Sequence, residues 1–185
     1  MRTMIIAILI TMTTQVGAEN SSASMIKLAQ AVHSIDANVI FMRHALAPGF
    51  GDPDSFDVAD CSTQRNLNAE GRAQARSIGA AMRNSGLQFK DILSSQWCRC
   101  TQSAELLNLG HWSTFDGLNS FFQGYSNKQV TLDLLNKKLA SLGDGLTLMV
   151  THQVVISAIT KNVVRSGALV AYNSTTLETQ AFTFD

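Results

Sequence analysis

The chain has 185 residues, of which 45% are hydrophobic, and its 14 basic residues balance 14 acidic ones. This length and composition are typical of one globular domain. A chain without net charge has no general field that attracts nucleic acid or an anionic membrane, so any anion site must be local. We therefore expect no nucleic-acid partner.

Residues 1–18 have the pattern of a secretory signal peptide, which would leave one mature domain at residues 19–185. Arg2 supplies a positive charge, residues 4–12 form an apolar run, and residues 16–18 offer a small-residue cleavage site. The run is short for a bilayer, so we expect no stable membrane span after cleavage, with an uncleaved tether as the alternative. The protein is therefore predicted to be periplasmic or secreted.

After a short helix with apolar residues at Ile26, Ala29 and Val32, the apolar run at residues 39–42 predicts a buried parallel strand. The strand delivers Arg43 and His44 to its carboxyl end, where open α/β sheets bind their ligands. Taken alone, the pair is more simply interpreted as a polar strand ending.

A long, turn-rich loop at residues 46–66 follows, and loops of this length in small domains are usually functional. Asn68 is placed to cap a helix at residues 69–82, whose small residues predict close packing onto the sheet.

The next strand, at residues 89–93, ends at Ser94 and Ser95, and a helix at about 98–109 follows. Arg99 lies in the first turn of that helix. A cation there opposes the helix dipole, which favours either a bound anion or an exposed arginine in a solvated turn.

A short strand at residues 112–115 leads into a turn-rich stretch where Phe121 and Phe122 could wall a pocket or pack in the core. The helix expected at 128–142 would place four apolar side chains inward: Val130, Leu134, Leu135 and Leu139.

The most apolar strand, at residues 146–150, delivers His152 to its carboxyl end. A helix at 153–164 and two closing strands at 168–172 and 176–184 complete the chain. Alternating strands and helices predict an α/β fold, a three-layer α/β/α sandwich with a mostly parallel central sheet.

Three cysteines remain, Cys61, Cys98 and Cys100. An oxidising compartment favours pairing and leaves one thiol over, so we expect one disulfide from Cys61 to Cys98 or to Cys100. No other Cys or His has zinc-ligand spacing to this set, so we expect no metal site.

Four basic groups thus converge on one sheet edge: Arg43, His44, Arg99 and His152. Two guanidiniums can clamp a phosphoryl group, and a neutral imidazole can attack its phosphorus in line. The second imidazole can stabilise the equatorial oxygens as charge shifts in the transition state.

The pattern resembles the histidine phosphatase superfamily, whose fold is called phosphoglycerate mutase-like. Residues 43–45 resemble its Arg-His-Gly signature, with Ala45 in the third place, and residues 66–75 its Leu-Thr-x-x-Gly-x-x-Gln-Ala segment. Residues 94–105 resemble the second-arginine motif and residues 150–152 the second-histidine motif.

The resemblance implies that His44 is the nucleophile, that Arg43 and Arg99 bind phosphate, and that His152 is the second imidazole. Arg65, in the loop that would cover the pocket, could also contact phosphate or lie at the surface. No cofactor or metal is implied.

The chain departs from the family at the proton donor. Gln153 follows His152 where the acid phosphatase branch has an aspartate, and the loop at 118–124 has no carboxylate where the mutase branch has a glutamate. Asp52 and Asp54 are candidate general acids in the long loop. Without an acid, alkyl esters should react slowly, since general acid catalysis contributes roughly 10²–10⁴-fold.

The expected function is an exported, metal-independent phosphomonoester hydrolase with a small phosphorylated substrate, such as a sugar phosphate or an envelope component. The signal segment and short domain resemble the lipopolysaccharide core heptose phosphate phosphatases of the superfamily. The alternative is a catalytically degenerate module of the same fold that binds phosphorylated ligands or proteins.

Overall fold

The computed structural model describes residues 26–184, so the signal segment predicted at residues 1–18 lies outside the described part of the chain. Within it, six strands form one sheet in the order β3-β2-β4-β1-β5-β6. The strands are β1 (Val39–Arg43), β2 (Phe89–Ser94), β3 (Ser113–Thr114), β4 (Leu146–Thr151), β5 (Leu169–Tyr172) and β6 (Thr179–Phe182). Strands β3, β2, β4 and β1 are parallel, while β5 and β6 add an antiparallel edge. The mostly parallel sheet is confirmed.

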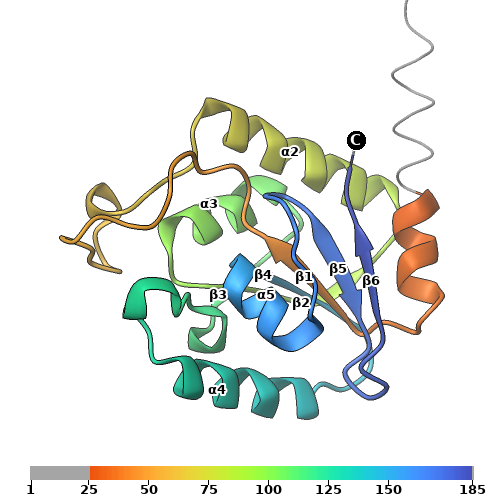
Figure 1. Cartoon of the computed structure of the whole chain (residues 1–185). Coiled ribbons are helices and arrows are strands. Elements are labelled where there is room, and N and C mark those ends of the chain that lie inside the picture. The colour runs from red at the N-terminus through yellow and green to blue at the C-terminus, as the bar shows by residue number, and fades with distance from the viewer. Residues whose placement is uncertain (1–25, 185) are drawn as a thin grey trace, which may run out of the picture.

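Helices cover both faces of the sheet (Figure 1). Residues 26–33 are helical, and the later helices are α2 (Ala69–Asn84), α3 (Cys98–Leu107), α4 (Lys128–Ala140) and α5 (Gln153–Thr160). Helix 26–33, α2 and α3 share one apolar core with Ile40 and Met42, whereas α4 and α5 share the other with Val39 and Phe41. Alternate β1 side chains therefore enter opposite cores, as the pleat of a strand requires, and the three-layer prediction is confirmed.

Helix α2 packs very closely on its neighbours. A Cβ atom on Gly79 would lie 2.0 Å from the Leu107 carbonyl oxygen, and one on Gly71 would lie 1.9 Å from the Leu46 carbonyl oxygen. The small residues of α2 thus fit it against α3 and the chain that follows β1, rather than against the sheet alone.

Two details of the expected helices were wrong. Val130 and Leu134 are 55% and 38% exposed, because α4 buries the stripe formed by Thr131, Leu135 and Leu139. Because Leu134 and Leu135 are adjacent, the apolar pattern allows either of two helix faces to be buried. Packing buries the face that contains Leu135. Helix α5 ends at Thr160 rather than at residue 164, because Lys161 takes a left-handed conformation with φ 63°.

No helix within residues 26–184 is long and apolar enough to cross a membrane.

Candidate active site

Three neighbouring parallel strands end together and deliver the polar groups. Arg43 of β1 pairs with Thr151 of β4, and Ser94 of β2 pairs with Val150 of β4. The next residues along each strand, His44, Ser95 and His152, therefore emerge at one sheet edge. All three are buried, and the ring centroids of the two histidines lie 5.4 Å apart.

A cavity of about 220 Å³ opens at this edge. Its lining contains every basic residue proposed from the sequence, namely Arg43, His44, Arg65, Arg99 and His152. The remaining lining residues are Gly49, Phe50, Gly51, Ser120, Phe122, Gln153 and Val154. The sequence motifs thus meet in one pocket, and none of the side chains that line it is a carboxylate.

The protonation of His44 follows from its surroundings. Its Nδ1 lies 2.8 Å from the Ala45 carbonyl oxygen, which can only accept, so Nδ1 carries the proton. Burial first, and then the charge of Arg99, lower the pKa of His44 well below its usual value. The ring is therefore neutral, and Nε2, which has no partner within residues 26–184, presents its lone pair.

Two guanidiniums that line the same cavity as His44 have unpaired donors. Arg43 donates from Nη1 to the Val164 carbonyl oxygen at 2.8 Å. Yet the Nε atoms of Arg43 and Arg99 are buried without a partner among the described residues. Both arginines line the cavity, so their guanidinium groups are placed to bind an anion there. Burial and then the charge of Arg99 lower the pKa values of Arg43 and Arg65, as expected where cations crowd together.

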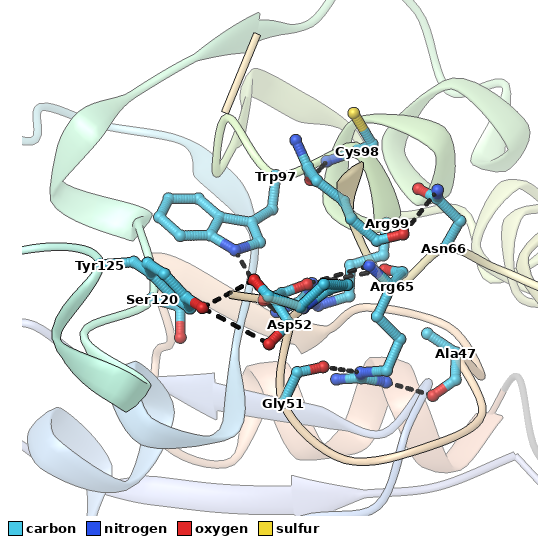
Figure 2. A network of polar contacts seen from close by, with 12 residues as sticks. Ala47, Gly51, Asp52, Arg65, Asn66, Trp97, Cys98, Arg99, Ser120 and Tyr125 are labelled. Carbon is cyan, nitrogen blue, oxygen red and sulfur yellow. Dashed lines mark hydrogen bonds and ion pairs between the residues drawn. The ribbon is translucent and has the colours of Figure 1, made fainter. Parts of the chain in front are cut away.

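Asp52 pairs with Arg99 outside the cavity lining (Figure 2). Arg99 donates from Nη1 and Nη2 to the two carboxylate oxygens at 2.8 and 3.0 Å. Trp97 Nε1 and the Arg65 backbone N–H donate to the same group at 3.1 and 3.0 Å. The position of Arg99 in the first turn of α3 favoured a bound anion nearby. The anion found there is the carboxylate of Asp52.

This environment opposes a proton-donor role for Asp52. Burial alone would raise its pKa, but the hydrogen bonds from Arg99 and Arg65 outweigh burial and hold the pKa below the ordinary value. Asp52 is therefore ionised and fully engaged. The other candidate acid, Asp54, is exposed on the same loop and does not line the cavity.

Arg65 combines two positions that the sequence left as alternatives. Its Nε donates to the Gly51 carbonyl oxygen at 2.8 Å, and its Nη1 donates to the Ala47 carbonyl oxygen (Figure 2). It also lines the cavity. Arg65 therefore holds the loop around Ala47 and Gly51 in place, and its own side chain forms part of the pocket wall.

A disulfide fastens the same loop to α3. The bond joins Cys61 to Cys98, one of the two expected pairings, and Cys100 is a buried free thiol. Burial raises the pKa of Cys100 to about 12, so it is un-ionised. Since Cys98 is the residue before Arg99, the loop is held covalently next to the arginine that Asp52 contacts.

The tautomer of His152 is set by a chain of hydrogen bonds. Asn119 Oδ1 accepts from the Gln96 backbone N–H at 2.9 Å, which fixes the orientation of the amide. The Ser95 hydroxyl donates to that oxygen at 3.1 Å. Its single proton is then used, so we assign the proton of this contact to His152 Nε2, which lies 2.9 Å from Ser95 Oγ and 3.4 Å from the Cys100 sulfur, a weak acceptor.

The consequence is that Nδ1 of His152 is unprotonated and has no partner within residues 26–184. Burial, followed by the charge of Arg99, lowers the pKa of His152 well below its usual value. The second imidazole is therefore neutral as well. Nδ1 can accept a hydrogen bond from a protonated phosphoryl oxygen, or donate one after taking up that proton.

The two departures from the family pattern have structural explanations. Gln153 donates to the Asn162 carbonyl oxygen at 3.2 Å and accepts from the Val164 backbone N–H at 2.8 Å, so it holds the chain after α5. Ala45 is fully buried and is not among the described residues with positive φ, so its methyl group adds no backbone strain.

Asn119 and Trp97 were not found by sequence reasoning. Each acts through another residue, Asn119 on His152 and Trp97 on Asp52. Neither residue belongs to a chemical motif in the sequence. The one signal for Asn119 was that it is a polar residue in a turn-rich stretch.

Comparison with known proteins agrees with this geometry. The family model described as histidine phosphatase superfamily (branch 1) matches residues 39–121. No curated protein sequence matches the chain significantly.

Solved structures show the fold at low sequence identity. The protein histidine phosphatase SixA complexed with tungstate is 16% identical with TM-score 0.55, over 78% of this chain and 94% of that one. A putative phosphohistidine phosphatase SixA from Agrobacterium tumefaciens is 19% identical with TM-score 0.53, over 80% and 96% of the two chains. Phosphoglycerate mutase from Thermus thermophilus is 16% identical with TM-score 0.58, over 80% and 99%.

Proposed function

Since the histidine phosphatase superfamily model matches residues 39–121, we propose that this chain is a member of that superfamily and hydrolyses phosphoric esters through a phosphohistidine at His44. The Nε2 lone pair forms the P–N bond as the bond from phosphorus to the leaving oxygen breaks, and the leaving group keeps the bonding electrons. Water then attacks phosphorus, breaks the P–N bond and releases inorganic phosphate.

The observation that carries the proposal is the pairing of a neutral, unprotonated Nε2 with two buried, unpartnered guanidinium Nε donors. The lone pair of His44 suits attack, while Arg43 and Arg99 suit a dianionic phosphoryl group. Within the lining, three arginines face two neutral imidazoles. Positive charge is therefore already in place where negative charge concentrates in the transition state.

His152 would assist from the side. With Nε2 held by Ser95, its Nδ1 is the nitrogen available to the cavity. A phosphate monoanion can pass its proton to this atom, and the resulting imidazolium can hydrogen-bond the equatorial oxygens. This chemistry uses side chains of the chain alone, so the proposed reaction is metal-independent.

The substrate would be a phosphorylated molecule with a good leaving group, because no carboxylate lines the pocket. Without a general acid, reactivity depends steeply on the acidity of the leaving group. A sugar phosphate or a phosphorylated envelope component was the expectation from the sequence, but a sugar alkoxide is a poor leaving group, so such esters would react slowly here. One SixA neighbour is described as a protein histidine phosphatase and the other as a putative phosphohistidine phosphatase, which adds a phosphorylated protein to the substrates for testing.

We also propose that the protein is exported. The signal-like pattern of residues 1–18 supports this, and the Cys61–Cys98 disulfide is compatible with an oxidising compartment. N-terminal sequencing of protein recovered from cell fractions should give a chain that starts near residue 19 in an extracytoplasmic fraction. A chain that retains residue 1, in the cytoplasm and with three free thiols, would refute export.

The test of the activity is hydrolysis of phenyl phosphate by purified protein in the presence of a metal chelator. Wild type and the exposed-loop control Asp54→Asn should turn over, and His44→Ala should not. Chelator-resistant activity that survives in His44→Ala would exclude the nucleophile assignment. Binding of tungstate without turnover by wild type would instead favour the degenerate binding module.

A further inference from the structure

Two phenylalanines stand at the opening of the cavity. Phe50 and Phe122 are 89% and 39% exposed and line the same cavity as the buried His44 and His152. Their ring centroids lie 5.1 Å apart with an interplanar angle of 83°, an edge-to-face pair. We call Phe50 and Phe122 the aromatic rim. Phe121, by contrast, packs against the core. Of the two roles predicted for this pair, Phe122 therefore lines the pocket and Phe121 packs in the core.

The loops that carry the rim are fastened to each other. Gln123 Oε1 accepts from the Asp52 backbone N–H at 2.8 Å, and its Nε2 donates to the Asp52 carbonyl oxygen at 3.3 Å. The Tyr125 hydroxyl donates to the Pro53 carbonyl oxygen at 2.8 Å. With a longer contact from the same hydroxyl to the Asp52 carbonyl oxygen at 3.4 Å, the segments after Phe50 and after Phe122 are joined by four hydrogen bonds. The rim is a built part of the pocket, not an isolated loop tip.

The direction of attack places the leaving group at this rim. In-line displacement requires the leaving oxygen to lie opposite the attacking atom across phosphorus. Since His44 is 2% exposed at the floor, the opposite direction runs toward the exposed part of the lining. The exposed lining residues are Gly49, Phe50 and Phe122, so the exposed side chains are the two phenyl rings; Arg43, Arg65, Gln153 and Val154 are partly buried.

The two rings of the aromatic rim offer no hydrogen-bonding group to a hydroxyl-rich leaving group. The amide of Gln153 is held by Asn162 and Val164, and that of Gln123 by Asp52, so neither side chain is free to turn toward the rings. The Ser120 hydroxyl is buried and accepts from the Phe122 backbone N–H at 3.3 Å. A sugar would lose hydration at the rim without regaining equivalent partners.

We propose that the aromatic rim is a leaving-group subsite for aryl phosphates, either small aryl esters or a phosphorylated tyrosine side chain in a peptide. The inference rests on the proposed function and names its substrate class. An aryl group can pack against the phenylalanine rings in an edge-to-face or offset arrangement. The aryloxide departs with its bonding electrons and takes its proton from solvent. The absence of a carboxylate from the lining then no longer hinders the reaction.

The test compares kcat/KM for phenyl phosphate with kcat/KM for acetyl phosphate, whose leaving group is small and also departs unprotonated. Phe50→Ala and Phe122→Ala should each lower this ratio by about fivefold to tenfold, as loss of an aromatic contact would. Phe50→Leu should give an intermediate ratio. Val130→Ala, which removes an exposed apolar side chain from α4, should leave the ratio unchanged.

Each outcome has a distinct meaning. An unchanged ratio in both alanine variants, or a wild-type kcat/KM for glucose 6-phosphate above that for phenyl phosphate, would overturn the subsite alone. Failure to hydrolyse even acetyl phosphate would refute the proposed function and the subsite with it. A phosphotyrosyl peptide that exceeds phenyl phosphate in kcat/KM would assign the subsite to protein substrates, and the reverse order would assign it to small esters.

Discussion

Replacement of Asp52 by asparagine removes the carboxylate that neutralises Arg99 in the interior. Both side chains are 4% exposed, and their closest contact is 2.8 Å. Breaking a buried pair by removing one partner lowers the free energy of unfolding by roughly 3–5 kcal/mol. For a chain of this size, about 2–4 °C is lost per kcal/mol, so the melting temperature should fall by about 6–20 °C.

The same pair predicts how the effect depends on pH. The hydrogen bonds from Arg99 and Arg65 lower the pKa of Asp52 despite its burial. A group with a depressed folded-state pKa stabilises the fold above its unfolded-state pKa, and this stabilisation is lost as pH falls through the folded-state pKa. The difference in melting temperature between wild type and Asp52→Asn should be complete at pH 7 and shrink below about pH 4.

Thermal unfolding followed by circular dichroism measures both effects, with Asp54→Asn as the matched control in the same loop. Kinetics provide the second readout. If Asp52 positions Arg99, Asp52→Asn should lower kcat/KM by a similar factor for aryl and alkyl phosphates. A variant that keeps the wild-type melting temperature and slows alkyl esters alone would refute this reasoning and restore Asp52 as the general acid.

Three further predictions concern the surroundings of the pocket. Cys61→Ser should lower the free energy of unfolding by about 2–4 kcal/mol in chemical denaturation, because the disulfide closes a loop across a sequence separation of 37; equal stability would contradict it. Asn119→Ala should lower kcat about tenfold and alter the pH–rate profile, since Ser95 could then donate to His152 and shift its tautomer; an unchanged profile would exclude that coupling. Gly79→Ala should destabilise by roughly 1–3 kcal/mol in a thermal melt, because its Cβ would meet the Leu107 carbonyl, whereas Gly143→Ala should not.

The sheet and the pocket were predictable because their signals are local. Apolar runs at β1 and β4 are buried throughout, and such runs place the following residues at the carboxyl edge without further information. The parallel register then brings Arg43, His44 and His152 together. The order of motifs along the chain supplied Arg99.

The remaining features depend on contacts between distant segments. Asp52 meets Arg99 across 47 positions, and Asn119 meets Ser95 across 24. No periodicity encodes such pairs, so Asp52 was interpreted by its chemistry, as a candidate acid, rather than by its partner. The predicted buried face of α4 was wrong for a related reason. Whether Leu134 or Leu135 is buried depends on how α4 packs in the core, which the helix sequence alone does not encode.

The phosphohistidine itself gives the most direct test of the central claim. Purified protein is mixed with phenyl phosphate, quenched rapidly in alkali, digested and analysed by mass spectrometry. We predict an acid-labile phosphoryl group on His44 during turnover and none in His44→Ala, which should also be inactive. A phosphoryl group on another residue, or sustained turnover by His44→Ala, would contradict it.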